Sequence, residues 1–462
     1  MWKPLFAACI ALSLTACGGG GSSADANPAA ADVLKSNPVP TNSTLVAQPL
    51  TRVNTTTAGN QAFRSIGALA DGGYTVAWIS DNSALFIQRY DSAGNKVGGE
   101  VSVPLVIQSA QSPGAGDSLA DPAAALRDSS IAVLGDGSVV VAYEIDRFVE
   151  QVGAFFQFKE GIYIQQFDAN GAQLLGETEV FSQVESRDSR SIFLSDPKIV
   201  PLADGGFTVA WVNLIPALTV DSTNTLFKQR FDGAAQPVGG VVTVGRFLQL
   251  DAAGLRLTAD ASGGYTLTVT FQGGFTEPFD RTAAIHFDAA DTATQIVAPR
   301  PGEVLLLPLG GDRYVLFSSD STGTFRQFLD SAGNPVGDPT PIPSMPFDAQ
   351  ELADGSFVVF WNLDGNLVWE RFDSSGTPLT NLQTIATKAG TTGAAPLANG
   401  GFAVSWSGPS GAGDVDVFTT QFLEVLSPTQ AELRAKRKAC LNSAKGMTGQ
   451  DRKAFVDACL AA

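Results

Sequence analysis

The chain has 462 residues and is acidic, with 29 Lys and Arg against 46 Asp and Glu and a formal charge of −17. This excess argues against a nucleic acid as partner, because nucleic acids are held by basic surfaces. The phosphate-binding pattern G-x-x-x-x-G-K-[ST] is absent, and no cofactor or metal is expected.

The first segment predicts export and membrane attachment. Lys3 precedes an apolar stretch, residues 5–14, that is too short to span a bilayer, which is typical of a signal peptide. Residues 14–17, Leu-Thr-Ala-Cys, resemble a bacterial lipobox, which implies cleavage after residue 16 and lipid on Cys17. An ordinary secretory signal with an incidental cysteine is the alternative. The domain prediction is a signal at 1–16 and a flexible Gly/Ser/Pro-rich tether at 17–42, and Gly18 favours the outer membrane by analogy.

The stretch LADGGYTVAW at residues 69–78 then introduces a repeat. Close copies are LADGGFTVAW, LADGSFVVFW and LANGGFAVSW, at 202–211, 352–361 and 397–406. Weaker copies occupy 134–143, 259–269 and 309–318. Each copy has an Asp, Asn or Gly turn followed by alternating apolar residues, the pattern of a strand leaving a tight turn. In the first copy the full unit contains four expected strands, at about 65–70, 74–79, 84–90 and 97–103.

The spacing of the copies predicts a ring. The aligned residues after each turn are Tyr74, Val139, Phe207, Tyr265, Tyr314, Phe357 and Phe402. The last three gaps are 49, 43 and 45 residues, and a four-stranded unit of that length is typical of a β-propeller blade. We therefore predict an all-β, seven-bladed β-propeller over 43–426. Since the last copy lacks a fourth strand and 43–53 is an orphan strand, the N-terminal strand is expected to close the last blade.

The units resemble the LADGGFVVTW…QRFDxxGxxVG repeats of large bacterial surface and secreted calcium-associated proteins, over about residues 43–425. The resemblance implies the repeat and no particular function. The acidic calcium-binding nonapeptides of that family are absent, so calcium does not carry over.

Extra residues gather in loops that a propeller places on one face, which favours this face for binding. The richest insert, at 144–160, brings together aromatic and charged residues. The predicted binding residues are Glu144, Arg147, Phe148, Phe155, Phe156, Phe158, Arg187 and Arg190. Two interpretations stay open for the insert: an aromatic patch with a charged rim, or an extended hairpin whose aromatic residues pack together. Arg187 and Arg190 are expected to bind an anion or to pair with the acidic body.

Catalytic constellations are poor, and no catalytic residue is predicted. The single histidine, His286, occupies the repeat position of Arg89 and Arg230, so it is interpreted as a strand-face substitution. Without a second histidine, zinc and Ser-His sites lack their residues. An acidic pair such as Glu144 with Asp221 is the one arrangement that would suit glycoside chemistry.

Residues 427–462 predict a small helical hairpin. Pro428 starts the first helix and Gly446 ends it. Cys9 leaves with the signal and Cys17 takes lipid, so Cys440 and Cys459 are expected to form a disulfide in an oxidising compartment. Residues 438–460 are similar to the PsiF repeat of small periplasmic proteins, which implies a location and no mechanism.

The sequence thus predicts a non-enzymatic, lipid-anchored propeller of the cell envelope that binds a protein or a glycan. Its membrane contact is expected to be the lipid on Cys17. Two alternatives stay open: a glycan-active hydrolase or lyase on the same scaffold, and a structural or assembly lipoprotein of the outer membrane.

Overall fold

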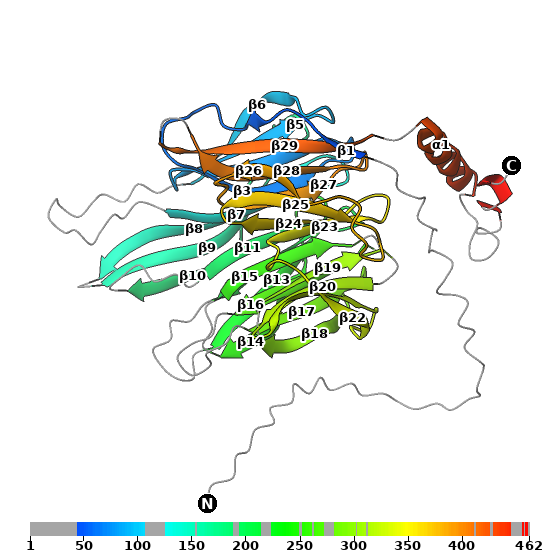
Figure 1. The fold of residues 1–462 in the computed structure, drawn as a ribbon. Helices are drawn as coiled ribbons and strands as arrows, with labels where there is room; N and C mark the ends of the chain where they lie inside the picture. The colour runs from blue at the N-terminus through cyan, green and yellow to red at the C-terminus, as the bar shows by residue number, and fades with distance from the viewer. Residues whose placement is uncertain are drawn as a thin grey trace, which may run out of the picture. The chain divides into compact units, whose positions relative to one another are not determined.

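A computed structural model describes residues 44–106, 125–152, 155–187, 194–213, 223–248, 252–260, 263–271, 281–301, 303–310, 313–410, 413–425, 428–444, 455–456 and 458–460. The chain divides into two compact units, one of which is Pro38–Ala431 and the other of which includes Glu432–Ala462. The first unit contains seven antiparallel sheets, which we number as blades one to seven in chain order (Figure 1). The predicted seven-bladed propeller is confirmed.

Blades one to six are each built from four strands that follow one another along the chain, whereas blade seven combines three such strands with strands from the N-terminus. The inner strands, which contact one another from blade to blade, are β3 (Gln61–Ala68), β7 (Ala125–Val133), β11 (Leu194–Pro201), β15 (Ala252–Ala259), β19 (Val304–Leu309), β23 (Asp348–Glu351) and β27 (Thr392–Pro396). The second strands are β4 (Tyr74–Ser80), β8 (Val139–Val152), β12 (Phe207–Asn213), β16 (Tyr265–Phe271), β20 (Arg313–Asp320), β24 (Phe357–Leu363) and β28 (Phe402–Pro409).

The outer half of each blade completes the sheet. The third strands are β5 (Ala84–Tyr90), β9 (Phe155–Phe167), β13 (Thr223–Phe231), β17 (Arg281–Phe287), β21 (Gly323–Leu329), β25 (Asn366–Phe372) and β29 (Val415–Val425). The fourth strands of blades one to six are β6 (Lys96–Val103), β10 (Gln173–Arg187), β14 (Pro237–Leu248), β18 (Ala293–Pro301), β22 (Pro335–Pro341) and β26 (Gln383–Thr387).

The N-terminal strand closes blade seven, as predicted. β1 (Thr44–Ala47) and β2 (Thr51–Arg52) both pair antiparallel with β29, with Thr44 opposite Val425. Just beyond β2, the buried Asn54 accepts a hydrogen bond from Val417 N at 2.8 Å and donates one to the Asp416 carboxylate at 2.6 Å. The two ends of the ring are therefore joined by backbone pairing and by a buried side chain, which removes two free sheet edges.

Hydrophobic packing between neighbouring blades forms the core. The second strands are almost wholly buried, and the tryptophans of the repeat lie within clusters that span two blades. Trp211, for example, packs with Ile162 and Ile164 of blade two. The interpretation that these tryptophans pack between blades is confirmed.

Repeated polar contacts fix the turns of the repeat. The aspartates that follow the third strands accept hydrogen bonds from backbone N–H groups in their own turns, as Asp91 does from Ala93 and Asn95. A second contact joins the third strand to the first turn: Arg89 pairs with Asp71 at 2.6 Å, and Arg371 pairs with Asp354 at 2.7 Å. His286 occupies the arginine position and lies 3.4 Å from Asp260. His286 therefore belongs to the scaffold.

C-terminal to the last blade, the chain forms one long helix, α1 (Pro428–Ser443), and a disulfide between Cys440 and Cys459. The disulfide and the start of the first tail helix were predicted correctly. Within the described residues no helix is long and apolar enough to span a membrane. Residues 1–43, and with them the predicted signal and Cys17, lie outside the described residues.

Candidate binding channel

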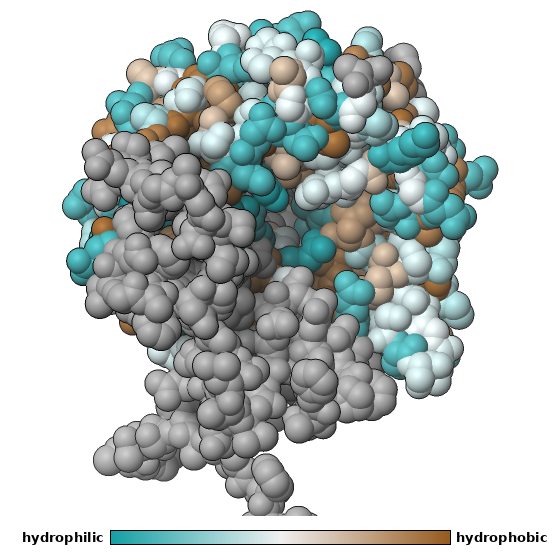
Figure 2. Space-filling model, turned by 90° about the vertical axis from the view of Figure 1, so that its left-hand side faces the viewer, coloured by the Kyte–Doolittle hydropathy of each residue, from teal (hydrophilic) through white to brown (hydrophobic). Residues whose placement is uncertain are grey.

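The inner strands of all seven blades line a cavity with a volume of 1510 Å³. The loops that join second and third strands, such as residues 81–83, define one face of the ring, which we call the insert face. The opposite face carries the short turns of the repeat and is called the turn face. Asp81, Asn82, Ser83 and Asn362 line the cavity from the insert face, where Figure 2 shows a central hollow bordered by hydrophilic residues. We call this cavity the channel.

Charged side chains interrupt the apolar inner strands where these strands line the channel. This charged layer consists of Arg64, Asp128, Lys198, Arg256 and Asp348, from blades one, two, three, four and six. Lys198 lies 3.2 Å from Asp128, and the Arg64 Nε atom lies 4.0 Å from the same carboxylate. Three blades therefore meet in one ion-pair network inside the channel.

Backbone irregularities place several of these side chains. The pairing of β3 with β4 shifts between Phe63 and Ser65, which brackets Arg64. The pairing of β7 with β8 shifts between Leu126 and Ser129, which brackets Arg127 and Asp128. Since a β-bulge re-aims a side chain that would otherwise alternate with its neighbours, these shifts explain how charged residues reach the channel from strands packed in a hydrophobic core.

Arg256 and Asp348 form the other side of the charged layer. The positive charge of Arg256 acts to lower the pKa of Asp348, but burial outweighs it and leaves that pKa raised. Both carboxylate oxygens of Asp348 are occupied, because Ala349 N and the Gln350 side chain donate to one and Ala394 N donates to the other. Among the described residues, Arg256 forms no hydrogen bond or ion pair. Its five N–H donors are available to a group in the channel.

Among the predicted binding residues whose side chains the structure describes, Glu144 is the one that lines the channel. Its side chain is 2% exposed, and its Oε1 atom has no hydrogen-bond partner within the part of the chain that the structure describes. Burial, followed by the nearby charge of Glu160, raises the pKa of Glu144 well above its usual range. Arg127 is engaged elsewhere, with Asp146 at 3.4 Å. A buried acid of this kind is more common at functional sites than elsewhere.

The insert at 144–160 is a continuation of strands β8 and β9, which stay paired as far as Val152 and Phe155 (Figure 1). The backbone of the insert is therefore an extended hairpin, and both interpretations of its aromatic side chains stay predictions. Phe158 is 7% exposed and packs within the sheet. The side chains of Phe148, Phe155, Phe156 and Arg187, as well as all of Arg190 and Asp221, lie outside the described residues.

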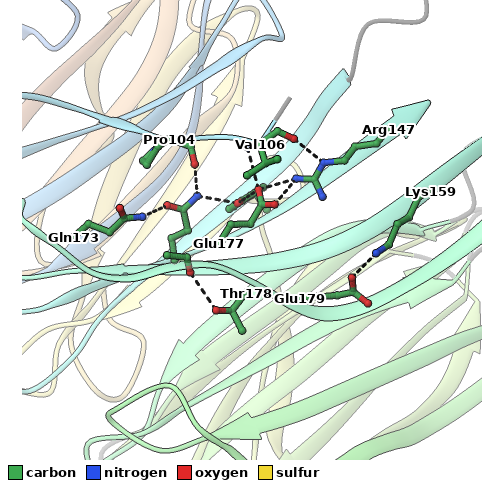
Figure 3. Close-up of polar contacts among 11 residues, drawn as sticks. Pro104, Val106, Arg147, Lys159, Gln173, Glu177, Thr178 and Glu179 are labelled. Atoms are coloured by element: carbon green, nitrogen blue, oxygen red, sulfur yellow. Dashed lines mark hydrogen bonds and ion pairs between the residues drawn. The ribbon is translucent and has the colours of Figure 1, made fainter. Parts of the chain in front are cut away.

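Arg147 holds this hairpin to its surroundings (Figure 3). Its guanidinium donates to both oxygens of Glu177 at 2.7 Å and to the Val106 carbonyl at 2.8 Å. It also lies 4.2 Å from the centre of the Tyr163 ring. Because every one of these partners is a protein group, the contacts give Arg147 a structural role in joining β8, β9 and β10.

The charged layer was not predicted from the sequence, because the binding site was expected in the loops where the copies differ in length. A signal was nevertheless present. Lys198, Arg256 and Asp348 each stand nine residues before the aromatic residue that follows the repeat turn. A charge at that place in an inner strand conflicts with an apolar core, and such a conflict is a guide to function.

No protein-family model and no curated protein matches the chain. Solved structures with partial similarity include a protein of unknown function from Dyadobacter fermentans, with 12% identity and a TM-score of 0.44 over 64% of this chain and 94% of that one. The alpha-L-arabinanase of Penicillium chrysogenum complexed with arabinobiose has 11% identity and a TM-score of 0.40, over 64% of this chain and 92% of that one. A prolyl endopeptidase has 16% identity and a TM-score of 0.43, over 78% of this chain and 47% of that one. Similarities at this level assign no activity to the chain.

Proposed function

We propose that this protein is a binding module of the bacterial cell envelope, and that it takes a glycan into the channel from the insert face. The observation that carries the proposal is the charged layer. Polar and charged groups occupy positions on the inner strands where apolar packing would serve the fold better, and they surround a cavity large enough for several sugar units.

The rim of the channel supports a glycan as the ligand. Asn82, Ser83, Asn362 and Thr391 are exposed there and carry amide or hydroxyl groups. Such neutral groups both donate and accept hydrogen bonds, which suits the hydroxyl groups of sugars. Apolar side chains such as Ile66 and Leu257 also line the channel and suit the less polar ring faces.

Binding is favoured over catalysis because two carboxylates of the charged layer, Asp128 and Asp348, already have partners. Asp128 is held by Lys198 and Arg64, and Asp348 accepts three hydrogen bonds from its own surroundings. A general acid or base must reach the atom whose proton it transfers, so groups committed in this way are poorly placed for that role.

The proposal is tested by screening the purified protein on a glycan array and measuring the affinity of each hit by calorimetry. Lys198→Gln is expected to weaken binding about tenfold or more, since it removes a charged hydrogen-bond donor from the channel. Lys159→Gln is the matched control, because Lys159 is a more exposed lysine that pairs with Glu179 on the hairpin. Equal losses in the two variants, or no array hit at all, would contradict a glycan site in the channel.

A glycan-active hydrolase is the second candidate. It is favoured by one observation: Asp128 and Asp348 lie in the same channel, and the pKa of Asp348 is raised by burial, as suits a general acid. Release of new reducing ends from the array hits, abolished by Asp348→Asn and by Asp128→Asn, would favour this candidate over simple binding.

We further propose that lipid on Cys17 holds the propeller at the outer membrane through the tether at 17–42. The lipobox-like segment and the Gly/Ser tract support this attachment. Labelled palmitate should enter the wild-type chain and not the Cys17→Ser variant, which should leave the membrane fraction. Membrane retention of that variant without label would contradict the proposal.

A further inference from the structure

We propose that the glycan carries a single carboxylate, as an isolated uronic acid does, and that Arg256 binds this group. The inference rests on the proposed function and narrows it, because it names the chemical class of the ligand and the residue that selects it.

Arg256 is the side chain of the charged layer that is left for a ligand. It lines the channel, it is half-buried, and it has no hydrogen bond or ion pair among the described residues. The planar guanidinium offers two parallel N–H groups, a geometry that fits the two oxygens of a carboxylate.

The neighbouring carboxylates leave Arg256 without an ion pair among the described residues. Asp348, the acid whose pKa responds to Arg256, accepts hydrogen bonds from Ala349 N, the Gln350 side chain and Ala394 N. Asp128 is in contact with Lys198 and Arg64. Neither carboxylate is therefore positioned to neutralise Arg256 by direct contact.

The charges that line the channel limit how much negative charge a ligand can bring. Over the whole lining, four cationic residues are matched by four acidic ones, which are Arg64, Arg127, Lys198 and Arg256 and Asp81, Asp128, Glu144 and Asp348. One carboxylate can pair with Arg256, whereas a phosphate monoester would bring a second negative charge close to Asp128 and Asp348.

The charge of the whole chain supports the same choice. A protein with a formal charge of −17 repels a polyanion before contact, and this repulsion acts over the distance of a Debye length. A glycan with one isolated uronic acid experiences far less of it than a fully charged polyuronate does.

The test compares acidic sugars with neutral copies of themselves. The probes are oligosaccharides of about two to six units that end in glucuronic or galacturonic acid, each paired with its carboxyl-reduced counterpart. For wild-type protein, the acidic form is expected to bind roughly 10-fold to 100-fold more tightly than the reduced form. Arg256→Gln should abolish the difference in affinity between the acidic and the reduced sugar. Arg256→Lys should keep part of this difference, because the positive charge remains while the two parallel N–H groups of the guanidinium are lost.

Arg230→Gln is the matched control, since it also removes one arginine but lies on the turn face, where it pairs with Asp204. The Arg230→Gln variant should keep the preference for the acidic sugar over its reduced counterpart. Equal binding of acidic and reduced sugars by wild type would overturn the inference and leave the proposed function standing. A preference that survives in Arg256→Gln would also overturn it. Failure of every saccharide to bind would remove the proposed function itself, together with the inference.

Discussion

At the scale of single residues, the channel contains groups whose surroundings oppose their charge. Glu144 is buried in blade two with Glu160 as a nearby charge and an unpartnered Oε1 atom within the described structure. Turn aspartates such as Asp91 and Asp330 have the opposite environment, in which hydrogen bonds from their own turns lower the pKa. A buried acid such as Glu144 lowers the stability of the folded protein at neutral pH, whereas the turn aspartates raise it.

Glu144→Gln is expected to raise the melting temperature at pH 7. The pKa of Glu144 is raised by folding, so the native state binds more protons than the unfolded state between the two pKa values. Stability contributed by this group therefore falls as the pH rises from about 4.3, the unfolded value, toward the folded pKa. Calorimetry from acid to neutral pH should show that the melting temperature of the wild-type protein falls with rising pH by an amount that is absent in the variant.

Glu150→Gln is the control for that measurement, because Glu150 is an exposed residue on the same hairpin. It should melt as the wild-type protein does at each pH. A Glu144→Gln protein that is less stable than wild type at pH 7 would show that the carboxylate has a stabilising partner.

Stability should also fall in strong acid, because of the turn aspartates. Their pKa values are lowered in the folded state, so the stability that they contribute is complete above the unfolded pKa of about 3.9 and is lost as the pH falls through the folded values. The melting temperature should decline steeply below about pH 4. Asp330→Asn should make that decline shallower, and an unchanged acid profile would contradict the role given to these turns.

At the scale of elements, the closing strand and the long hairpin are two segments that side-chain contacts hold to the propeller. Just beyond the closing strand, Asn54 accepts a hydrogen bond from Val417 N and donates one to the Asp416 carboxylate. The hairpin is held by Arg147, Glu177 and Tyr163. In both cases a buried polar contact joins segments that backbone pairing alone would leave at an edge.

Asn54→Ala should destabilise the propeller by about 2–4 kcal/mol, since it leaves a buried N–H group and a buried carboxylate with one partner fewer. Denaturant unfolding measures the change, and hydrogen exchange should show faster exchange over 44–53 than in wild type. Gln48→Ala is the control, because that side chain makes only an exposed local hydrogen bond at 3.3 Å. It should cost less than about 0.5 kcal/mol.

Arg147→Met should loosen the hairpin by leaving the Glu177 carboxylate without its guanidinium. Breaking a buried ion pair costs about 3–5 kcal/mol, whereas replacing both partners by apolar residues restores much of the loss. Hydrogen exchange over β8 and β9 should therefore rise in Arg147→Met and fall back in Arg147→Met/Glu177→Leu. If the double variant exchanged faster than the single one, the pair would not be the contact that holds the hairpin.

The elements that follow the repeat were predicted correctly from the sequence, whereas the residues at interruptions of the repeat were not. The turns and second strands were predicted because Gly and Asp at fixed places and period-2 alternation specify them directly. In blade one the inner strand was expected at about 65–70 and runs over Gln61–Ala68. The register shift beside Arg64 interrupts the alternation of apolar and polar residues. The start of the strand and the residue that reaches the channel could therefore not be predicted from that alternation.

At the scale of the whole molecule, ring closure and site formation are linked. Seven inner strands, each apolar enough to pack against a neighbouring blade, converge on one axis and bring together charges from segments that lie far apart in the chain. The number of blades could be predicted from recurrence. The meeting of Arg64, Lys198 and Asp128 could not, because it depends on which inner-strand residues point toward the axis.

The claim that the ligand enters the channel is tested most directly by blocking it. Thr392 lines the channel from β27, so Thr392→Trp fills space there without removing any charge. Thr340→Trp adds the same side chain on the exposed outer strand β22. Calorimetric titration with an oligosaccharide that binds wild type should give no measurable binding for Thr392→Trp and wild-type affinity for Thr340→Trp. Wild-type affinity in a folded Thr392→Trp protein would contradict the account.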